Sequence, residues 1–306
     1  MIDLPAEQRE LVDRVTAFVD SEVVPVAQAR DTRDEYPVDL VGRLRELGLF
    51  GLVAPVQYGG AGVEPPAYAL VMEELGRGWV SLVPIANAHS SVVTILSRYG
   101  TEAQRGHWLP RLARGELMGA LGLTEASGGS DLAAITTTAN KQGDGYHVRG
   151  AKRLITHARG AGLLLVLAKT DPAAEPSTRA LALFLLEQEG VEWRVTRDLP
   201  KLGARSVETS ELTIEASVPA DRLVGEQVGA GFRQLMDGLE VGRIAVAAAA
   251  IGLARAALWD AVAYARERRA FGRPIAELQG LRFKLADLAT QIAAARALVL
   301  AAARAK

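Results

Sequence analysis

Residues 121–131 read LGLTEASGGSD, a stretch that changes from apolar to small and polar along its length. A loop of small residues lets backbone N–H groups approach a flat ring or a pyrophosphate closely. The hydroxyl of Ser130 can also donate a hydrogen bond to a phosphate oxygen. The stretch therefore suits a phosphate-bearing ligand, although a polar hairpin loop without any ligand would have the same composition.

Short β-prone runs follow this loop toward the C-terminus. Turn residues separate them, and Gly143-Asp144-Gly145 is typical of a hairpin. Some runs are continuously apolar, as expected for strands that are buried on both faces. Five or more strands without intervening helices favour a β-barrel or sandwich over a parallel sheet. The predicted strands are Ile135–Ala139, Tyr146–Val148, Leu163–Lys169, Ala180–Leu186 and Glu208–Ile214.

Helical patterns flank the strand-rich region on both sides. Apolar residues recur at helical spacing over Glu7–Val24, and Pro25 is expected to end that helix. The other predicted helices are Pro37–Leu47, Ala67–Leu75, Ser90–Tyr99, Phe232–Arg268 and Leu278–Lys306. The sequence thus predicts an α+β protein. It has an N-terminal all-α domain at 1–117, a middle β-barrel or sandwich domain at 118–228, and a C-terminal helical bundle at 229–306.

The two C-terminal helices present wide apolar faces that they cannot bury against each other alone. We therefore expect more chain or another subunit to cover them. Neither a glycine cap nor a proline stop precedes Lys306. This favours a longer enzyme, with only two bundle helices present here, over a naturally shortened homologue.

Composition excludes several classes of function. The chain has a formal net charge of -1, which gives no support for nucleic-acid binding. It contains no cysteine, and its four histidines show no metal-ligand spacing, so we expect no metal site. No secretory signal is visible, and the apolar run Ile244–Ala254 is too short to span a bilayer. We expect a soluble cytoplasmic protein that does not bind membranes.

Three segments together resemble the acyl-CoA dehydrogenase family. Residues 121–131 resemble its L-T-E-P-x-A-G-S-D signature, with Ala126 in place of proline. Residues 150–157 resemble G-x-K-x-W-I-T-N, with Leu154 for tryptophan and His157 for asparagine. Residues 267–275 resemble E-R-x-x-F-G-x-P-[IL], and the family's glutamine follows at position 279. The three stand in the family's order, whereas no G-x-G-x-x-G supports a Rossmann-type site.

The resemblance implies FAD as cofactor and assigns roles to individual residues. Thr124 and Ser130 would contact FAD, and Thr156 would lie beside flavin N5. Arg268, with Phe271 and Gln279, would reach the FAD of a partner subunit. The full cofactor-binding set is Leu121, Thr124, Gly129, Ser130, Ile155, Thr156, Arg268, Phe271 and Gln279, and the substrate-binding set is Ser130, Glu240 and Arg243.

Plainer interpretations of four of these residues stay open. Thr156 could be an ordinary strand threonine, and Arg268 could belong to a solvated arginine cluster. Glu240 and Arg243 could form an i,i+3 ion pair, and an arginine buried in this apolar helix would need such a partner.

The reaction implied is FAD-dependent α,β-dehydrogenation of an acyl-CoA or acyl-carrier-protein thioester. Electrons would pass to electron-transfer flavoprotein, in a homo-oligomer that is a tetramer or dimer. The family's base is a glutamate in a C-terminal Y-E-G-T-like motif, which these residues lack, or stands directly before the arginine, where this chain has Gly242. We therefore assign no catalytic residue within 1–306. A non-catalytic FAD- or thioester-binding homologue and a related flavoprotein oxidase are the alternatives.

Overall fold

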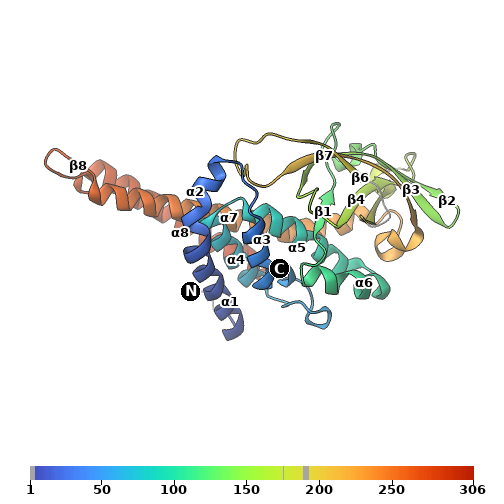
Figure 1. Cartoon of the computed structure of the whole chain (residues 1–306), viewed down its shortest axis with the longest axis horizontal. Coiled ribbons are helices and arrows are strands. Elements are labelled where there is room, and N and C mark those ends of the chain that lie inside the picture. The colour runs from blue at the N-terminus through green and yellow to red at the C-terminus, as the bar shows by residue number, and fades with distance from the viewer. Residues whose placement is uncertain (1–3, 175, 189–192) are drawn as a thin grey trace. The chain divides into compact units, whose positions relative to one another are not determined.

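The structure is a computed structural model that describes residues 4–174, 176–188 and 193–306. Two compact units divide the chain, and each gathers separate segments. The helical unit contains the chain up to Ala29, Val63–Val83 and Arg243–Lys306. The sheet unit contains Arg30–Gly62 and Pro84–Gly242. Figure 1 follows the chain through its helices and strands.

Seven strands form one sheet in the sheet unit, in the order β1-β4-β2-β3-β7-β6, with β5 also paired to β4. Strand β4 pairs in parallel with β1 and antiparallel with β5. The β2–β3 hairpin turns at Gly143-Asp144, where Gly143 has φ of 60°, and this confirms the predicted hairpin. The bounds are β1 (Gly119–Gly122), β2 (Thr138–Gln142), β3 (Gly145–Thr156), β4 (Leu163–Lys169), β5 (Leu181–Glu187), β6 (Trp193–Asp198) and β7 (Thr209–Pro219).

The predicted strand Ile135–Ala139 is wrong in its first half. Leu132–Ala134 form a 3-10 turn, which the Asp131 carboxylate supports by accepting a hydrogen bond from the Ala133 N–H at 3.1 Å. The backbone N–H groups of Thr136 and Thr137 donate to the Glu125 carboxylate instead of to a neighbouring strand. The strand can therefore begin only at Thr138.

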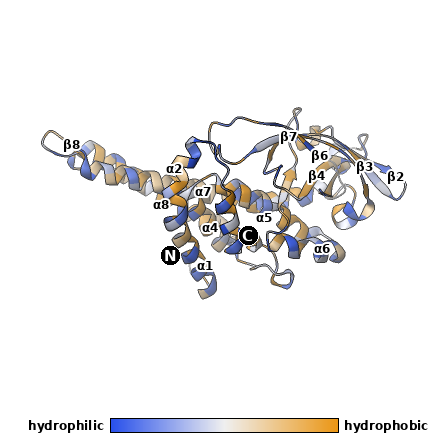
Figure 2. Cartoon of the chain, in the orientation of Figure 1, coloured by the Kyte–Doolittle hydropathy of each residue, from blue (hydrophilic) through white to orange (hydrophobic). Residues whose placement is uncertain are grey.

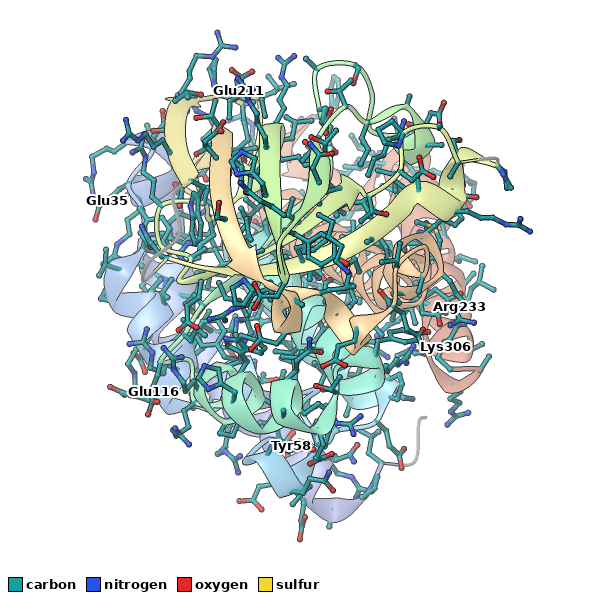
Figure 3. All side chains as sticks on the ribbon, turned by 90° about the vertical axis from the view of Figure 1, so that its right-hand side faces the viewer. Glu35, Tyr58, Glu116, Glu211, Arg233 and Lys306 are labelled. Atoms are coloured by element: carbon teal, nitrogen blue, oxygen red, sulfur yellow. The ribbon has the colours of Figure 1, made fainter. Side chains whose placement is uncertain are left out.

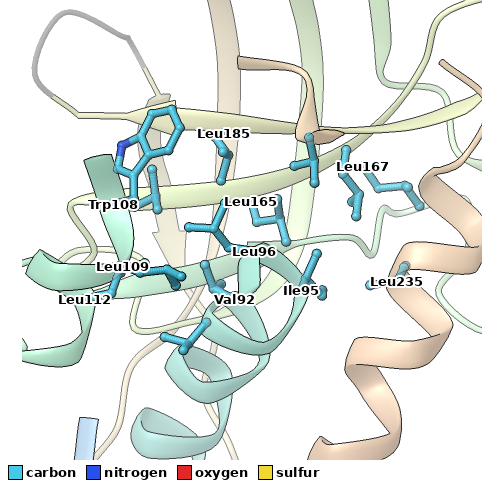
Figure 4. Packing of buried hydrophobic residues seen from close by; sticks show 14 of the residues in the cluster. Val92, Ile95, Leu96, Trp108, Leu109, Leu112, Leu165, Leu167, Leu185 and Leu235 are labelled. Atoms are coloured by element: carbon cyan, nitrogen blue, oxygen red, sulfur yellow. The ribbon is translucent and has the colours of Figure 1, made fainter. Parts of the chain in front are cut away.

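Strand β4 has buried residues pointing to both sides of the sheet. Leu163, Leu165 and Leu167 pack with residues of α5 (Leu82–Tyr99) and α6 (Glu102–Ala113), as Figure 4 shows for several of them. The alternate residues Leu164 and Val166 belong to a second cluster with side chains of β3 and β7. Burial on both faces explains why this strand reads as a continuous apolar run.

Helix α6 was not predicted, although it completes the first of these clusters. Thr101 and Gln104 form a capping box at its start, in which each side chain binds the other's backbone N–H. Pro110 lies inside the helix and obscures the pattern. Helix α3 (Val38–Glu46) also belongs to the sheet unit, and Gly48, with φ of 73°, follows it as a left-handed stop.

Pro25 does not end the first helical segment, contrary to the prediction. Helix α1 (Ala6–Phe18) continues into a π-helical turn (Val19–Val23) and then into α2 (Val24–Thr32). Pro25 lies directly after the π turn, where the hydrogen-bond pattern of the helix changes, so its missing N–H interrupts the pattern without ending the helical segment.

The helical unit contains the long helices α7 (Gly231–Glu267, from Arg243 onward) and α8 (Gln279–Arg304), together with α4 (Pro65–Gly78). Helices α4 and α7 come close at Gly252, where an added Cβ would lie 1.9 Å from the Glu73 carbonyl oxygen. The hairpin β8 (Arg269–Ala270) and β9 (Arg273–Pro274) joins α7 to α8.

Apolar residues recur along α7 and α8 (Figure 2), and several large ones are exposed, such as Trp259 and Leu298. Both helices are long and apolar enough to cross a membrane by length and composition alone. Core helices of soluble proteins share that property, so it is weak support for a membrane protein.

Candidate functional site

The loop after β1 folds back on itself over Thr124. The Thr124 carbonyl accepts a hydrogen bond from the Arg153 N–H at 2.8 Å, which joins the loop to β3. A Cβ at Gly129 would lie 2.9 Å from the Thr124 Cγ2 atom, so only glycine fits this position without displacing the threonine. Thr124 and Gly129 are half-buried and Ser130 is exposed.

A buried ion pair holds this loop in place. The Lys152 ammonium group lies 2.8 Å from a Glu125 carboxylate oxygen, and the two side chains are only 0% and 3% exposed. The same ammonium group donates to the Leu123 carbonyl at 3.2 Å. The carboxylate also accepts hydrogen bonds from the hydroxyl and the backbone N–H of both Thr136 and Thr137. Sequence reasoning missed this pair, although both partners lie within the motifs quoted above.

The pair is charged near neutral pH. Burial would raise the pKa of Glu125, but the Lys152 charge and the hydrogen bonds outweigh it and hold the pKa at about 2. Burial lowers the pKa of Lys152 to about 8, against the attraction of Glu125. A charged pair with this many hydrogen bonds fixes the backbone of residues 123–125 next to β3.

The end of β3 is irregular on both sides of Ile155 and Thr156. A bulge interrupts the pairing with β7 between Lys152 and Ile155. Leu154 has φ of 61° and is 56% exposed, so an apolar side chain projects where the resembling motif has tryptophan. His157 has φ of 60° and is buried.

The described residues leave three hydroxyl groups of this region without an internal partner. No side chain or backbone group of the described chain hydrogen-bonds to the hydroxyl of Thr124, Ser130 or Thr156. Solvent or a ligand must satisfy these groups. The side chains of Leu121 and Ile155 pack instead on the core clusters of the sheet unit, so a contact of Ile155 with a ligand would use its backbone.

These features fit one edge of a flavin nucleotide. The glycine-containing loop admits a close approach, the free hydroxyls can bind polar atoms, and Leu154 offers an apolar contact for a flat ring. The outer face of the sheet is different in character. There Glu211 on β7 (Figure 3) pairs with Arg153 and Arg197 at 3.1 and 3.0 Å.

The predicted cofactor residues of the helical unit lie around the β8–β9 hairpin. Phe271 occupies the turn with φ of 52° and is 89% exposed. Arg268 directly precedes β8, and Gln279 begins α8; both side chains are exposed. These three residues therefore share one end of the helical hairpin, and the exposure of Arg268 fits either cofactor binding or a solvated arginine cluster.

The predicted substrate residues differ in exposure. Glu240, in the sheet unit, is half-buried, whereas Arg243 in the helical unit is exposed rather than buried in an apolar helix. The prediction of a buried arginine failed because its helix leaves one face uncovered. Next to Glu240 in the sheet unit, the Gly242 carbonyl accepts from the Asn87 amide at 3.4 Å, and a Cβ at Gly242 would lie 3.3 Å from the Ser91 hydroxyl.

Comparisons with known proteins match the whole arrangement. Residues 5–116, 120–217 and 229–306 match the N-terminal, middle and C-terminal domains of acyl-CoA dehydrogenases. An acyl-CoA dehydrogenase of Bacillus subtilis (strain 168) is 39% identical over 299 residues, covering 97% of this chain and 78% of that protein.

Solved structures agree. The butyryl-CoA dehydrogenase of Megasphaera elsdenii superimposes with a TM-score of 0.94 at 34% identity, covering 99% of this chain and 80% of that one. A chain in a structure of the electron transferring flavoprotein of Acidaminococcus fermentans superimposes with a TM-score of 0.92 at 35% identity, covering 99% of this chain and 80% of that one.

The fold and these comparisons thus define a flavin-dependent oxidoreductase. The chain belongs to the acyl-CoA dehydrogenase family, and FAD is its cofactor.

Proposed function

We propose that the protein dehydrogenates an acyl-CoA thioester at its α,β-bond and passes the electrons to an electron-transfer flavoprotein. The observation that carries the proposal is the set of hydroxyls at Thr124, Ser130 and Thr156, which have no partner among the described residues and lie on a loop and strand held by the Lys152–Glu125 pair. FAD, when bound, accepts the hydride that leaves the β-carbon.

The residues of the chain would bind and orient. Thr124 and Ser130 would hold the cofactor, with backbone N–H groups approaching it past Gly129. The Thr156 hydroxyl would donate to the flavin ring where negative charge develops. Ser130 would also touch the thioester, together with Glu240 and Arg243. Arg268, Phe271 and Gln279 would contact the cofactor of a neighbouring subunit.

Several further properties belong to the proposal. We infer a homodimer or homotetramer, because large apolar side chains of α7 and α8 such as Phe283 and Leu298 are exposed in the chain alone. The proposal also includes a cytoplasmic location, a role in fatty acid metabolism, and no nucleic-acid or membrane partner. It divides the chain into three domains at 1–117, 118–228 and 229–306. We assign no carboxylate base among residues 1–306.

Anaerobic addition of acyl-CoA thioesters of increasing chain length to the FAD-loaded protein tests the proposal. We expect at least one thioester to bleach the visible flavin absorbance, and electron-transfer flavoprotein to restore it. Flavin that stays oxidised across the whole series would favour a non-catalytic binding protein. Rapid oxygen consumption with substrate would favour an oxidase.

A further inference from the structure

The backbone at Thr156 is held in an unusual conformation by the residues on either side. Leu154 and His157 both have φ near 60°, a left-handed region that few residues other than glycine adopt, with asparagine, aspartate and histidine as the most frequent exceptions. Ile155 and Thr156 lie between them and pair with Ser210 and Thr209 of β7. Such a conformation persists only where surrounding contacts enforce it, and it is often found at functional sites.

On the C-terminal side, the contacts that enforce it converge on the His157 ring. The ring stacks on Tyr36, with centroids 5.8 Å apart and planes inclined by 12°. The Tyr36 hydroxyl and His157 Nδ1 are 2.9 Å apart, and Glu208 Oε1 lies 3.6 Å from the same nitrogen. The His157 N–H donates to the Glu208 carbonyl at 3.2 Å. A Cβ at Gly160 would lie 2.3 Å from the ring, so glycine there makes room for it.

Burial keeps both partners of the Tyr36–His157 hydrogen bond neutral. Burial lowers the pKa of His157, so the ring is neutral, and burial raises the pKa of Tyr36, so its hydroxyl keeps the proton. With both groups neutral, either can donate in this bond, and the tautomer of the histidine ring sets which one does. This bond links positions that are 121 residues apart in sequence.

We propose that His157 and Tyr36 are positioning residues that fix the Thr156 hydroxyl for its hydrogen bond to the flavin ring. The inference rests on the proposed flavin site. Position 157 differs from the motif that this segment resembles, because the motif has asparagine where this chain has histidine. Asparagine and histidine both adopt φ near 60° more readily than most residues, but only histidine adds an aromatic ring that stacks on Tyr36.

The test measures the two-electron midpoint potential and the visible circular dichroism of bound FAD. Tyr36→Phe keeps the stacked ring and removes only the hydroxyl, and His157→Ala removes the ring. Losing a donor to the reduced flavin should lower the potential. We expect the relative affinity for reduced over oxidised flavin to fall about threefold to tenfold, the larger change corresponding to about 30 mV. The dichroism should change as well.

A matched control and a double variant make the test specific. Tyr146→Phe removes a hydroxyl from β3 that makes no hydrogen bond with the described residues, and it should leave both measurements unchanged. Thr156→Val should lower the potential like Tyr36→Phe. If Tyr36 acts through Thr156, combining the two changes should add little further shift.

Two results overturn the inference and differ from each other. Wild-type protein that binds no FAD would refute the proposed function and the inference with it. FAD-loaded Tyr36→Phe with the wild-type potential and dichroism would refute the positioning role alone, even if its melting temperature fell. Should His157→Ala not fold, Tyr36→Phe still decides the question, because it keeps the stacked ring.

Discussion

Replacing Glu125 by glutamine should destabilise the sheet unit strongly, because it leaves the Lys152 charge buried without its partner. The two side chains are 3% and 0% exposed, and their charged atoms are 2.8 Å apart. Breaking a buried pair by removing one charge typically costs about 3–5 kcal/mol. The lowering of the pKa of Glu125 from 4.5 to about 2 corresponds to roughly 3 kcal/mol, which agrees with that range.

The pH dependence of the loss gives the prediction a second test. Since the folded pKa of Glu125 lies below its unfolded value, its contribution is complete above pH 4.5 and disappears as the pH falls toward 2. At the other end, the folded pKa of Lys152 is about 8, below its unfolded 10.5, and without the carboxylate this amine loses its proton at a still lower pH. The loss of unfolding free energy caused by Glu125→Gln should therefore be largest between about pH 4.5 and pH 8, and it should shrink at lower and at higher pH.

Urea unfolding at several pH values measures the deficit. Glu215→Gln is the matched control, because Glu215 is 60% exposed and pairs with His147 and Arg149 on the surface of the same sheet. Such a surface pair should contribute no more than about 1 kcal/mol. Equal unfolding free energies for the two variants near neutral pH would refute the account of the Lys152–Glu125 pair.

Three other predictions concern stability. Gly252→Ala should destabilise the helical unit by about 1–3 kcal/mol, because the new Cβ would lie 1.9 Å from the Glu73 carbonyl oxygen. Gly280→Ala in α8 is the control: its Cβ would meet no atom within 4 Å, so thermal unfolding should show a gain in stability of up to about 1 kcal/mol. The opposite order of stability would contradict the α4–α7 contact. Glu73→Gln weakens the hydrogen bonds that this side chain accepts from Arg255 and Arg296, so amide hydrogen exchange in α8 should become faster. Unchanged exchange would show that the contact with Arg296 does not hold α8. Burial lowers the pKa of His89 from 6.5 to about 4. The contribution of His89 to the unfolding free energy is therefore complete above pH 6.5 and falls by roughly 3 kcal/mol toward pH 4. His89→Gln should flatten the pH dependence of the unfolding free energy over this interval, and an unchanged slope would exclude His89 as the source of that dependence.

Local patterns in the sequence predicted the elements that depend on local chemistry. Strand β4 was predicted with its observed bounds, because a continuous apolar run is unambiguous when turn residues flank it. The β2–β3 turn followed from the properties of glycine and aspartate. Strand β1 was missed, because its four residues, Gly119–Gly122, acquire their strand conformation by pairing with β4, which comes more than forty residues later.

The candidate site shows the same limit. The motif segments around Thr124 and Thr156 predict which residues face a cofactor, and that assignment stays a prediction. What holds those residues in place lies elsewhere in the chain. Lys152 and Glu125 are 27 positions apart, and Tyr36 and His157 are 121 apart. No periodicity or spacing connects such pairs, because only the folded chain brings them together.

The most direct test of the proposed reaction is the identity of the product after one anaerobic turnover. FAD-loaded protein would be mixed with an equal amount of an acyl-CoA thioester, and the thioester analysed by mass spectrometry while the flavin absorbance is recorded. We predict an α,β-unsaturated thioester, lighter by two hydrogen atoms, in an amount equal to the reduced flavin. Recovery of unchanged thioester beside oxidised flavin, for every acyl chain tried, would contradict the account.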